Sequence, residues 1–160
     1  MNAFRAVMLR DLAAVRAELA AYDTDEQLWE LPAGLPNPAG SLALHLAGNI
    51  QHFIGAALGG TDYVRDRDGE FGRRGVSRQE LDEQLAAAHQ VVDQVLAGIT
   101  DDQLAAPFPV ALGGVTLRTD VALAHLAGHL TYHLGQLDYH RRVVTGNADG
   151  VGAVSPKQLA

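Results

Sequence analysis

Apolar residues recur every three or four positions over four long stretches of the chain, the spacing that places them on one face of an α-helix. The first stretch covers about residues 2–22, and its apolar face consists of Phe4, Met8, Leu12, Val15, Leu19 and Tyr22. The other three stretches cover about residues 41–58, 77–97 and 119–144. Four amphipathic helices in one small chain predict an all-α protein, a four-helix bundle with short extra helical turns.

The ends of these helices carry local signals. Two pairs predict a capping box, in which a hydroxyl and a side chain three residues later cap backbone N–H groups; they are Thr24 with Gln27 and Ser77 with Glu80. Residues 100–103 predict the start of another short helical turn. Glycines at 59–60, 98 and 146 predict where three of the long helices stop. We therefore expect a bundle domain over residues 1–146 and a tail or partner-facing arm over 147–160.

The segments between the helices are predicted as loops. Residues 32–40 contain three prolines and two glycines, and residues 61–75 are charged and glycine-containing, which predicts a long surface loop. Residues 110–117 predict either a loop or a poor hairpin. A faint repeat, His-Leu-Ala-Gly at 45–48 and 125–128, places Gly48 and Gly128 inside helices. We interpret both glycines as sites where the two His-bearing helices approach closely, because glycine inside a helix needs compensation.

Three histidines, His125, His129 and His133, are spaced four residues apart in the last helix. Successive side chains are offset by only about 40° around the axis and about 6 Å along it, so His129 and His133 can point to one metal ion. The alternative is that they are ordinary solvated or core histidines. Three at one spacing in an apolar context favour the metal-site interpretation.

The second helix carries His45, Asn49 and His52 on one face, within an apolar stretch that favours partial burial. A buried imidazole needs hydrogen-bond partners or a metal. One imidazole from this helix, added to the pair on the last helix, predicts a three-histidine site with open positions, as in catalytic metal centres. His52 lies two turns beyond His45, about 10 Å along the axis, which is too far for both to bind one metal easily.

Other candidate residues have weaker claims. We interpret His89 and His140 as surface residues and Tyr132 as a core aromatic rather than a residue that orients a ligand. Asp11 and Glu18 share a face of the first helix and are interpreted as solvated carboxylates, so no general base is identified.

Composition narrows the classes of partner. The chain has 160 residues, 48% hydrophobic and 19% charged, which is typical of a globular domain. A net charge of −7 without a basic patch argues against nucleic acid, and the absence of cysteine excludes thiolate ligands. No apolar run reaches the roughly 18 residues of a membrane span and no signal peptide is evident, so we expect no membrane association and a cytoplasmic location.

The chain resembles the DinB superfamily (DinB/YfiT-like metalloproteins), four-helix bundles with a three-histidine metal centre. In that family the first ligand comes from the start of the second helix, as in the His45-Leu-Ala-Gly-Asn49 segment here. The other two come from a His-x-x-x-His-x-Gly-Gln motif, which residues 129–136 match completely. The resemblance implies that the metal ligands are His45, His129 and His133. Three polar residues are expected beside them or in the pocket wall: Asn49, His125 and Gln136.

The resemblance implies a divalent metal, zinc or nickel before iron, more firmly than it implies a reaction. The family includes bacillithiol and mycothiol transferases, a maleylpyruvate isomerase and metal-dependent hydrolases. We expect transfer of a low-molecular-weight thiol to a small-molecule electrophile, because a metal presents thiolate or hydroxide near neutral pH. The alternatives are a metal-dependent hydrolase and a non-catalytic metal-binding stress-response bundle. A homodimer is also expected.

Overall fold

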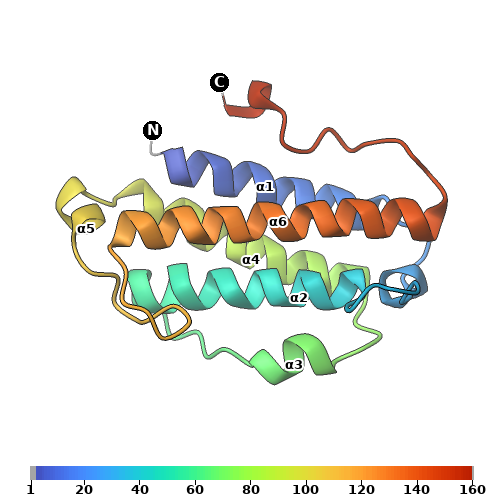
Figure 1. Cartoon of the computed structure of the whole chain (residues 1–160), viewed down its shortest axis with the longest axis horizontal. Coiled ribbons are helices and arrows are strands. Elements are labelled where there is room, and N and C mark those ends of the chain that lie inside the picture. The colour runs from blue at the N-terminus through green and yellow to red at the C-terminus, as the bar shows by residue number, and fades with distance from the viewer. Residues whose placement is uncertain (1–2, 160) are drawn as a thin grey trace.

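The computed structural model describes residues 3–159 and shows the expected all-α bundle. Its long helices lie side by side in Figure 1: α1 (Ala3–Ala20), α2 (Ala39–Ile50), α4 (Arg78–Ala97) and α6 (Thr119–Thr145). The short elements are η1 (Glu26–Trp29), η2 (Gln51–Leu58), α3 (Arg67–Gly72), α5 (Asp101–Ala105) and η3 (Pro156–Leu159). The prediction of a four-helix bundle with short extra turns is therefore confirmed.

The predicted caps and stops account for some of the helix ends. The capping box predicted at Thr24 does not form, because η1 begins after Asp25 and has no side-chain cap. The Thr100 side chain and Gln103 form a reciprocal capping box at α5. Ser77 accepts a hydrogen bond from the Glu80 backbone N–H at the start of α4, but the Glu80 carboxylate binds Arg73 instead of closing the box. The last helix ends at Gly146, which adopts the left-handed φ of +69°.

The second long helix changes type part-way along. It begins as α2 at Ala39, inside the segment expected to be a loop, and its last eight residues form the π-helix η2. A π-helix adds residues to each turn and often occurs at functional sites. Residues 110–117 form a loop with one isolated bridge, Leu112 to Val115, rather than a regular hairpin.

The core lies between helices that pack in a square. Both α1 and α2 contact α4 and α6, so α2 and α6 are neighbours. They run in opposite directions in Figure 1, which places the start of α2 beside the second half of α6. The predicted apolar face of the first helix is largely buried, with Met8, Leu12, Val15 and Leu19 at 1% exposure or less.

Among residues 3–159, no helix is long and apolar enough to cross a membrane.

Three polar residues expected at the surface are buried instead. Asp11 and Glu18 are fully buried between α1 and α6, where Asp11 accepts from the Thr131 hydroxyl. Glu18 accepts a 2.5 Å hydrogen bond from Arg141 Nε, and Arg141 is itself 1% exposed. A helical face holding acidic residues resembles a solvated face in sequence. Asp11 pairs with its neighbour Arg10, but the counter-charge of Glu18 lies 123 residues away, where local spacing cannot identify it.

His140 is also buried rather than exposed. The Tyr22 hydroxyl donates to its Nδ1 at 2.7 Å, and its Nε2–H donates to the Glu30 carbonyl at 2.9 Å. Burial lowers the His140 pKa, so the ring is neutral at pH 7 and both nitrogens are satisfied. This histidine therefore joins three segments of the chain and leaves no nitrogen for a ligand.

The segment after α6 turns back along the bundle (Figure 1). Arg141 donates to the backbone carbonyls of Asn147 and Asp149, and η3 packs against α1. The buried Arg141 thus links the bundle to the segment expected to be a tail.

Replacing Arg141 with Met should lower the free energy of unfolding by about 3–5 kcal/mol, because Glu18 is left buried without its counter-charge. The neighbouring Arg142 has a side chain that is 32% exposed and binds Asp138 near the surface, so Arg142→Met should have a smaller effect. Chemical denaturation of both variants measures the difference. Equal losses in the two would contradict a buried ion pair that stabilises the fold.

Candidate metal centre

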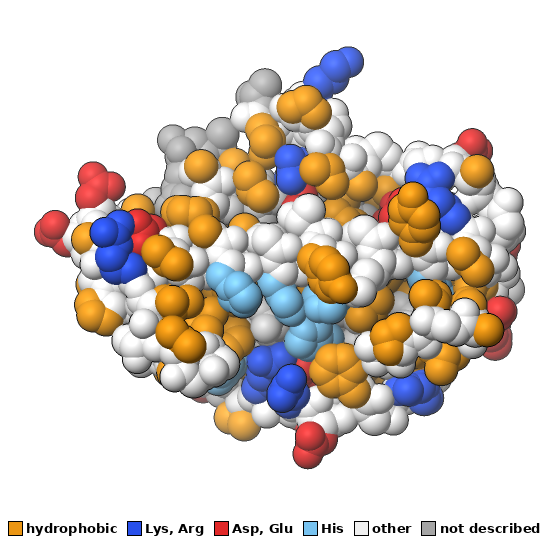
Figure 2. All heavy atoms as spheres, in the orientation of Figure 1, with side chains coloured by type: hydrophobic (Ala, Val, Ile, Leu, Met, Phe, Trp, Pro, Cys, Tyr) orange, Lys and Arg blue, Asp and Glu red, His pale blue; other side chains and the backbone are white. Residues whose placement is uncertain are grey.

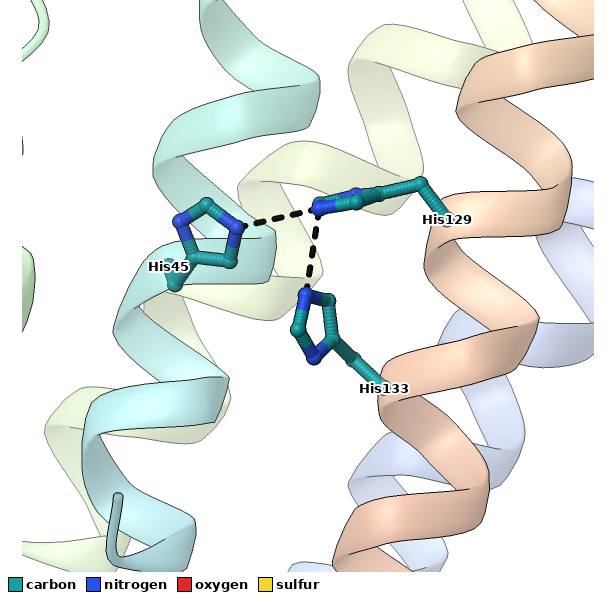
Figure 3. Close-up of side chains that lie close together, drawn as sticks. All are labelled: His45, His129 and His133. Atoms are coloured by element: carbon teal, nitrogen blue, oxygen red, sulfur yellow. Dashed lines mark hydrogen bonds between the residues drawn. The ribbon is translucent and has the colours of Figure 1, made fainter. Parts of the chain in front are cut away.

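Packing of α2 against α6 brings three imidazole rings to one point. His45 comes from α2 and His129 and His133 from successive turns of α6, and Figure 3 shows the rings pointing toward one another. The Nε2 atom of His129 lies 3.2 Å from that of His45 and 3.1 Å from that of His133. One ligand nitrogen from each ring lies within 4.8 Å of the others. The three histidines could therefore hold a metal ion.

The outer nitrogens of two rings are held by acceptor groups. His45 Nδ1 lies 2.9 Å from Glu70 Oε2, and His133 Nδ1 lies 2.6 Å from Gln136 Oε1. A carboxylate and an amide oxygen only accept hydrogen bonds, so each of these Nδ1 atoms carries the proton. In the neutral rings the inward Nε2 atoms of His45 and His133 are then bare lone pairs.

These tautomers create a mismatch that a cation would remove. Two lone pairs point at His129 Nε2, which carries at most one proton and can satisfy only one of them. The other ring nitrogen of His129, Nδ1, is buried and has no hydrogen-bond partner among the described residues. A positive ion between the three rings would interact favourably with all three lone pairs, so the donor set fits a metal ion.

The protonation state of the rings agrees with this arrangement. Burial, together with the neighbouring imidazoles and Arg65, lowers the His129 pKa to about 4. Burial also lowers the His133 pKa, opposed in part by its hydrogen bond to Gln136. At pH 7 both rings are neutral, and neutral imidazole is the form that binds metals.

Comparison with known protein families agrees with the family that the His-x-x-x-His-x-Gly-Gln motif indicated. The sequence model of the DinB superfamily matches residues 7–137, more than four fifths of the chain. This chain belongs to the DinB superfamily. No curated protein and no solved structure gave a match. The matched region of this DinB-superfamily protein contains all three histidines of the cluster and both residues that hold their outer nitrogens.

Residues 61–75, which were expected to be a long surface loop, supply Glu70, the residue that holds the outer nitrogen of His45. Within residues 61–75 of this DinB-superfamily protein, α3 begins after Asp66, whose side chain caps Gly69 N. Its Glu70 is 5% exposed and reaches His45. Sequence reasoning missed Glu70, because a glutamate between a glycine and an aromatic residue in a charged stretch gives no sign of which helix it will contact.

Arg65 keeps the buried carboxylate ionised. Its Nε and Nη2 atoms donate to the two Glu70 oxygens at 2.6 and 2.8 Å, a bidentate pair. Burial raises the Glu70 pKa, but the hydrogen bonds from Arg65 and His45 outweigh it, so the pKa lies below its usual value. The guanidinium also lies 5.8 Å from the centre of the Phe53 ring, which the π-helix η2 presents.

The two helical glycines have different surroundings from those expected. A Cβ atom on Gly48 would lie 2.2 Å from Glu70 Oε1, so this glycine admits the carboxylate of α3 rather than close packing of α6. A Cβ atom on Gly128 would have no heavy atom of another segment within 4 Å. The interpretation of both glycines as contacts between α2 and α6 was therefore wrong.

The remaining candidate residues surround the cluster without joining it. Asn49 is buried, and its Oδ1 has no partner among the described residues. His125 is exposed, with its ring stacked at 6.3 Å from that of His129. Tyr132 is 64% exposed, so its interpretation as a core residue was wrong, and its ring contacts His133 edge-on. His52 lies in η2 outside the cluster.

The cluster can be reached from outside the protein. His129 and His133 are only partly buried, and pale-blue histidine side chains are visible in the middle of the face drawn in Figure 2. Hydrophobic and basic side chains surround them there. A ligand from solution can therefore approach the point where the rings converge.

Replacing Gly48 with Ala should lower the affinity for Zn²⁺ by about 10–100-fold, because the methyl group displaces the carboxylate that orients His45. Gly128→Ala is the matched control, since it adds the same atom to the equivalent motif on α6 without a clash. It should leave the affinity unchanged and raise the free energy of unfolding by up to about 1 kcal/mol. Competition with a chromogenic chelator measures the affinities, and equal values for the two variants would refute the role of Glu70.

Proposed function

We propose that this protein binds a divalent ion, zinc or nickel, through His45, His129 and His133, and uses it to transfer a low-molecular-weight thiol to an electrophile. The convergence of three lone-pair nitrogens at a point open to solvent carries the proposal. When bound, the ion would lower the pKa of a thiol and so supply a nucleophile near neutral pH. Three protein ligands leave room for such a group.

The charge around the site supports an anionic ligand. All three imidazoles are neutral ligands, so they leave the double positive charge of the ion uncompensated. Glu70 is the carboxylate that hydrogen-bonds to the cluster, and Arg65 pairs with both its oxygens. The carboxylate therefore adds little net negative charge, and attraction for a thiolate is retained.

The lack of a free base favours a thiol over water. Both Glu70 oxygens are engaged, and no other carboxylate among residues 3–159 hydrogen-bonds to the three imidazoles. A bound metal lowers the pKa of both ligands, but a free thiol starts from a pKa of about 8.5 and free water from a far higher one, so the thiol needs less help from a dedicated base to lose its proton. The structure thus supports thiol transfer more than the alternative of hydrolysis.

Residues beside the cluster can bind and orient the reactants. The unpartnered Oδ1 of the buried Asn49 can accept a hydrogen bond from a substrate N–H or O–H group. The exposed His125, stacked on His129, can pass the thiol proton to solvent. In the overall reaction a sulfur–carbon bond forms, the leaving group departs with its electron pair, and the thiol proton is released to solvent.

Metal binding is tested with two histidine variants. His129→Ala should abolish stoichiometric binding, because it removes the ring that contacts both others, while His89→Ala should bind one ion per chain as the unmodified protein does. The protein is purified without a nickel column, and its metal content is measured by mass spectrometry after loading and dialysis. Equal retention by both variants would overturn the assignment of ligands.

Activity is tested by screening low-molecular-weight thiols against electrophiles with metal-loaded protein. Product formation should depend on the metal, and His133→Ala should lower kcat/KM on the order of 10³-fold, as expected when several kcal/mol of stabilisation are lost. The control is again His89→Ala, which should retain activity. Metal-dependent ester or amide hydrolysis without thiol transfer would support the hydrolase instead. Stoichiometric metal binding with neither activity would support a non-catalytic metal-binding bundle.

A further inference from the structure

A groove of about 450 Å³ runs along the second half of α6, beside the histidine cluster. One wall is formed by α6 and the opposite wall by the loop before α2, with Leu42 of α2 between them. Its apolar lining includes Leu35, Pro36, Leu42, Tyr132, Tyr139 and Val143. None of the described residues that line it is Lys, Arg, Asp or Glu. The volume lies in the range of roughly 300–1,000 Å³ typical of small-molecule sites.

The apolar side chains of α6 in this groove are unusually exposed. Tyr132, Tyr139 and Val143 lie seven and four residues apart, which places them on one face of the helix. They are 64%, 72% and 62% exposed. Orange side chains adjoin the pale-blue histidines on the right-hand side of Figure 2, toward the end of α6. Large apolar groups gathered at the surface are typical of a site that binds a ligand or a partner, and the volume of this groove fits a small molecule.

The groove is continuous with the histidine cluster through two residues. Gln136 lines the groove, and its Oε1 accepts from His133 Nδ1 at 2.6 Å. Tyr132 also lines it, and its ring centre lies 5.2 Å from that of His133. Because the Gln136 oxygen is occupied by His133, its NH₂ group is left to donate to a ligand. None of the three clustered histidines lines the groove itself, so a molecule in it lies next to two residues that contact His133 and meets a hydrogen-bond donor there.

We infer that this groove binds the electrophile, and that the electrophile is a neutral compound with an aromatic or branched alkyl group, a carbonyl oxygen and a leaving group on the carbon that the thiol attacks. The apolar group lies between Tyr139, Val143 and Leu35, and the carbonyl oxygen accepts from Gln136 at the end nearest His133. A charged group is disfavoured, because the groove offers no counter-charge. The inference rests on the proposed function, since it assigns a substrate to the same site.

Binding is tested first without turnover. Zinc-loaded protein is titrated with acetophenone, a neutral aromatic ketone, and with benzoate, its charged counterpart, and amide NMR shifts of the groove residues are followed. Acetophenone should bind at least about 10-fold more tightly than benzoate. Val143→Asp should weaken acetophenone binding by at least about 10-fold, because it puts a charge into the apolar groove. The matched control Val121→Asp replaces another exposed valine of α6, outside the groove, and should have no effect.

The same variants separate this inference from the proposed function. If acetophenone binds as expected and no electrophile is turned over, the groove assignment stands and thiol transfer fails. If thiol transfer occurs but Val143→Asp leaves the KM for aromatic electrophiles unchanged, the groove assignment is overturned and the proposed function stands. If light scattering shows that Val143→Asp, but not Val121→Asp, splits a dimer into monomers, the groove is a contact between two copies and the inference is overturned.

Discussion

The hydrogen bond between Glu70 and His45 links the fold to the candidate metal centre. Glu70 is buried, and a buried carboxylate stays ionised only where charges or donors compensate it. Arg65 supplies the charge, His45 supplies an N–H, and Gly48 leaves the space that the carboxylate occupies. In return, Glu70 fixes the proton on His45 Nδ1 and so directs a lone pair at the other two rings. A residue of the short helix α3 thereby determines which nitrogen of His45, in α2, is available to bind a metal ion.

Helix α6 combines a chemical role with a structural one. One face presents His129 and His133 to α2, while Thr131 contacts the buried Asp11 of α1 and Arg141 pairs with Glu18. Fully buried charged groups fix the position and rotation of a helix more narrowly than apolar packing does, because a small shift leaves them unpaired. The Arg141–Glu18 ion pair and the hydrogen bond from Thr131 to Asp11, both on the α1 side, can therefore hold the imidazoles on the α2 side in the geometry that a metal requires.

Much of this protein could be predicted from its sequence, because the features concerned depend on residues close together in the chain. Hydrophobic periodicity and glycine stops predicted the long helices to within a few residues, and α6 was expected over 119–144 and observed over Thr119–Thr145. The four-residue spacing of His129 and His133 places two imidazoles on adjacent turns wherever that segment is helical. The motif then indicated the family, which the family match confirmed.

The features that only the tertiary structure decided all depend on contacts between distant segments. Glu70 lies 25 residues from His45, and Glu18 lies 123 residues from Arg141. From the sequence alone, both carboxylates resemble solvated surface groups. Nothing near His140 in the sequence indicates its buried contact with Tyr22. Whether a polar side chain is buried depends on whether packing brings it a partner that offsets the loss of water. Local spacing carries no information about that partner, and only the assembled bundle supplies it.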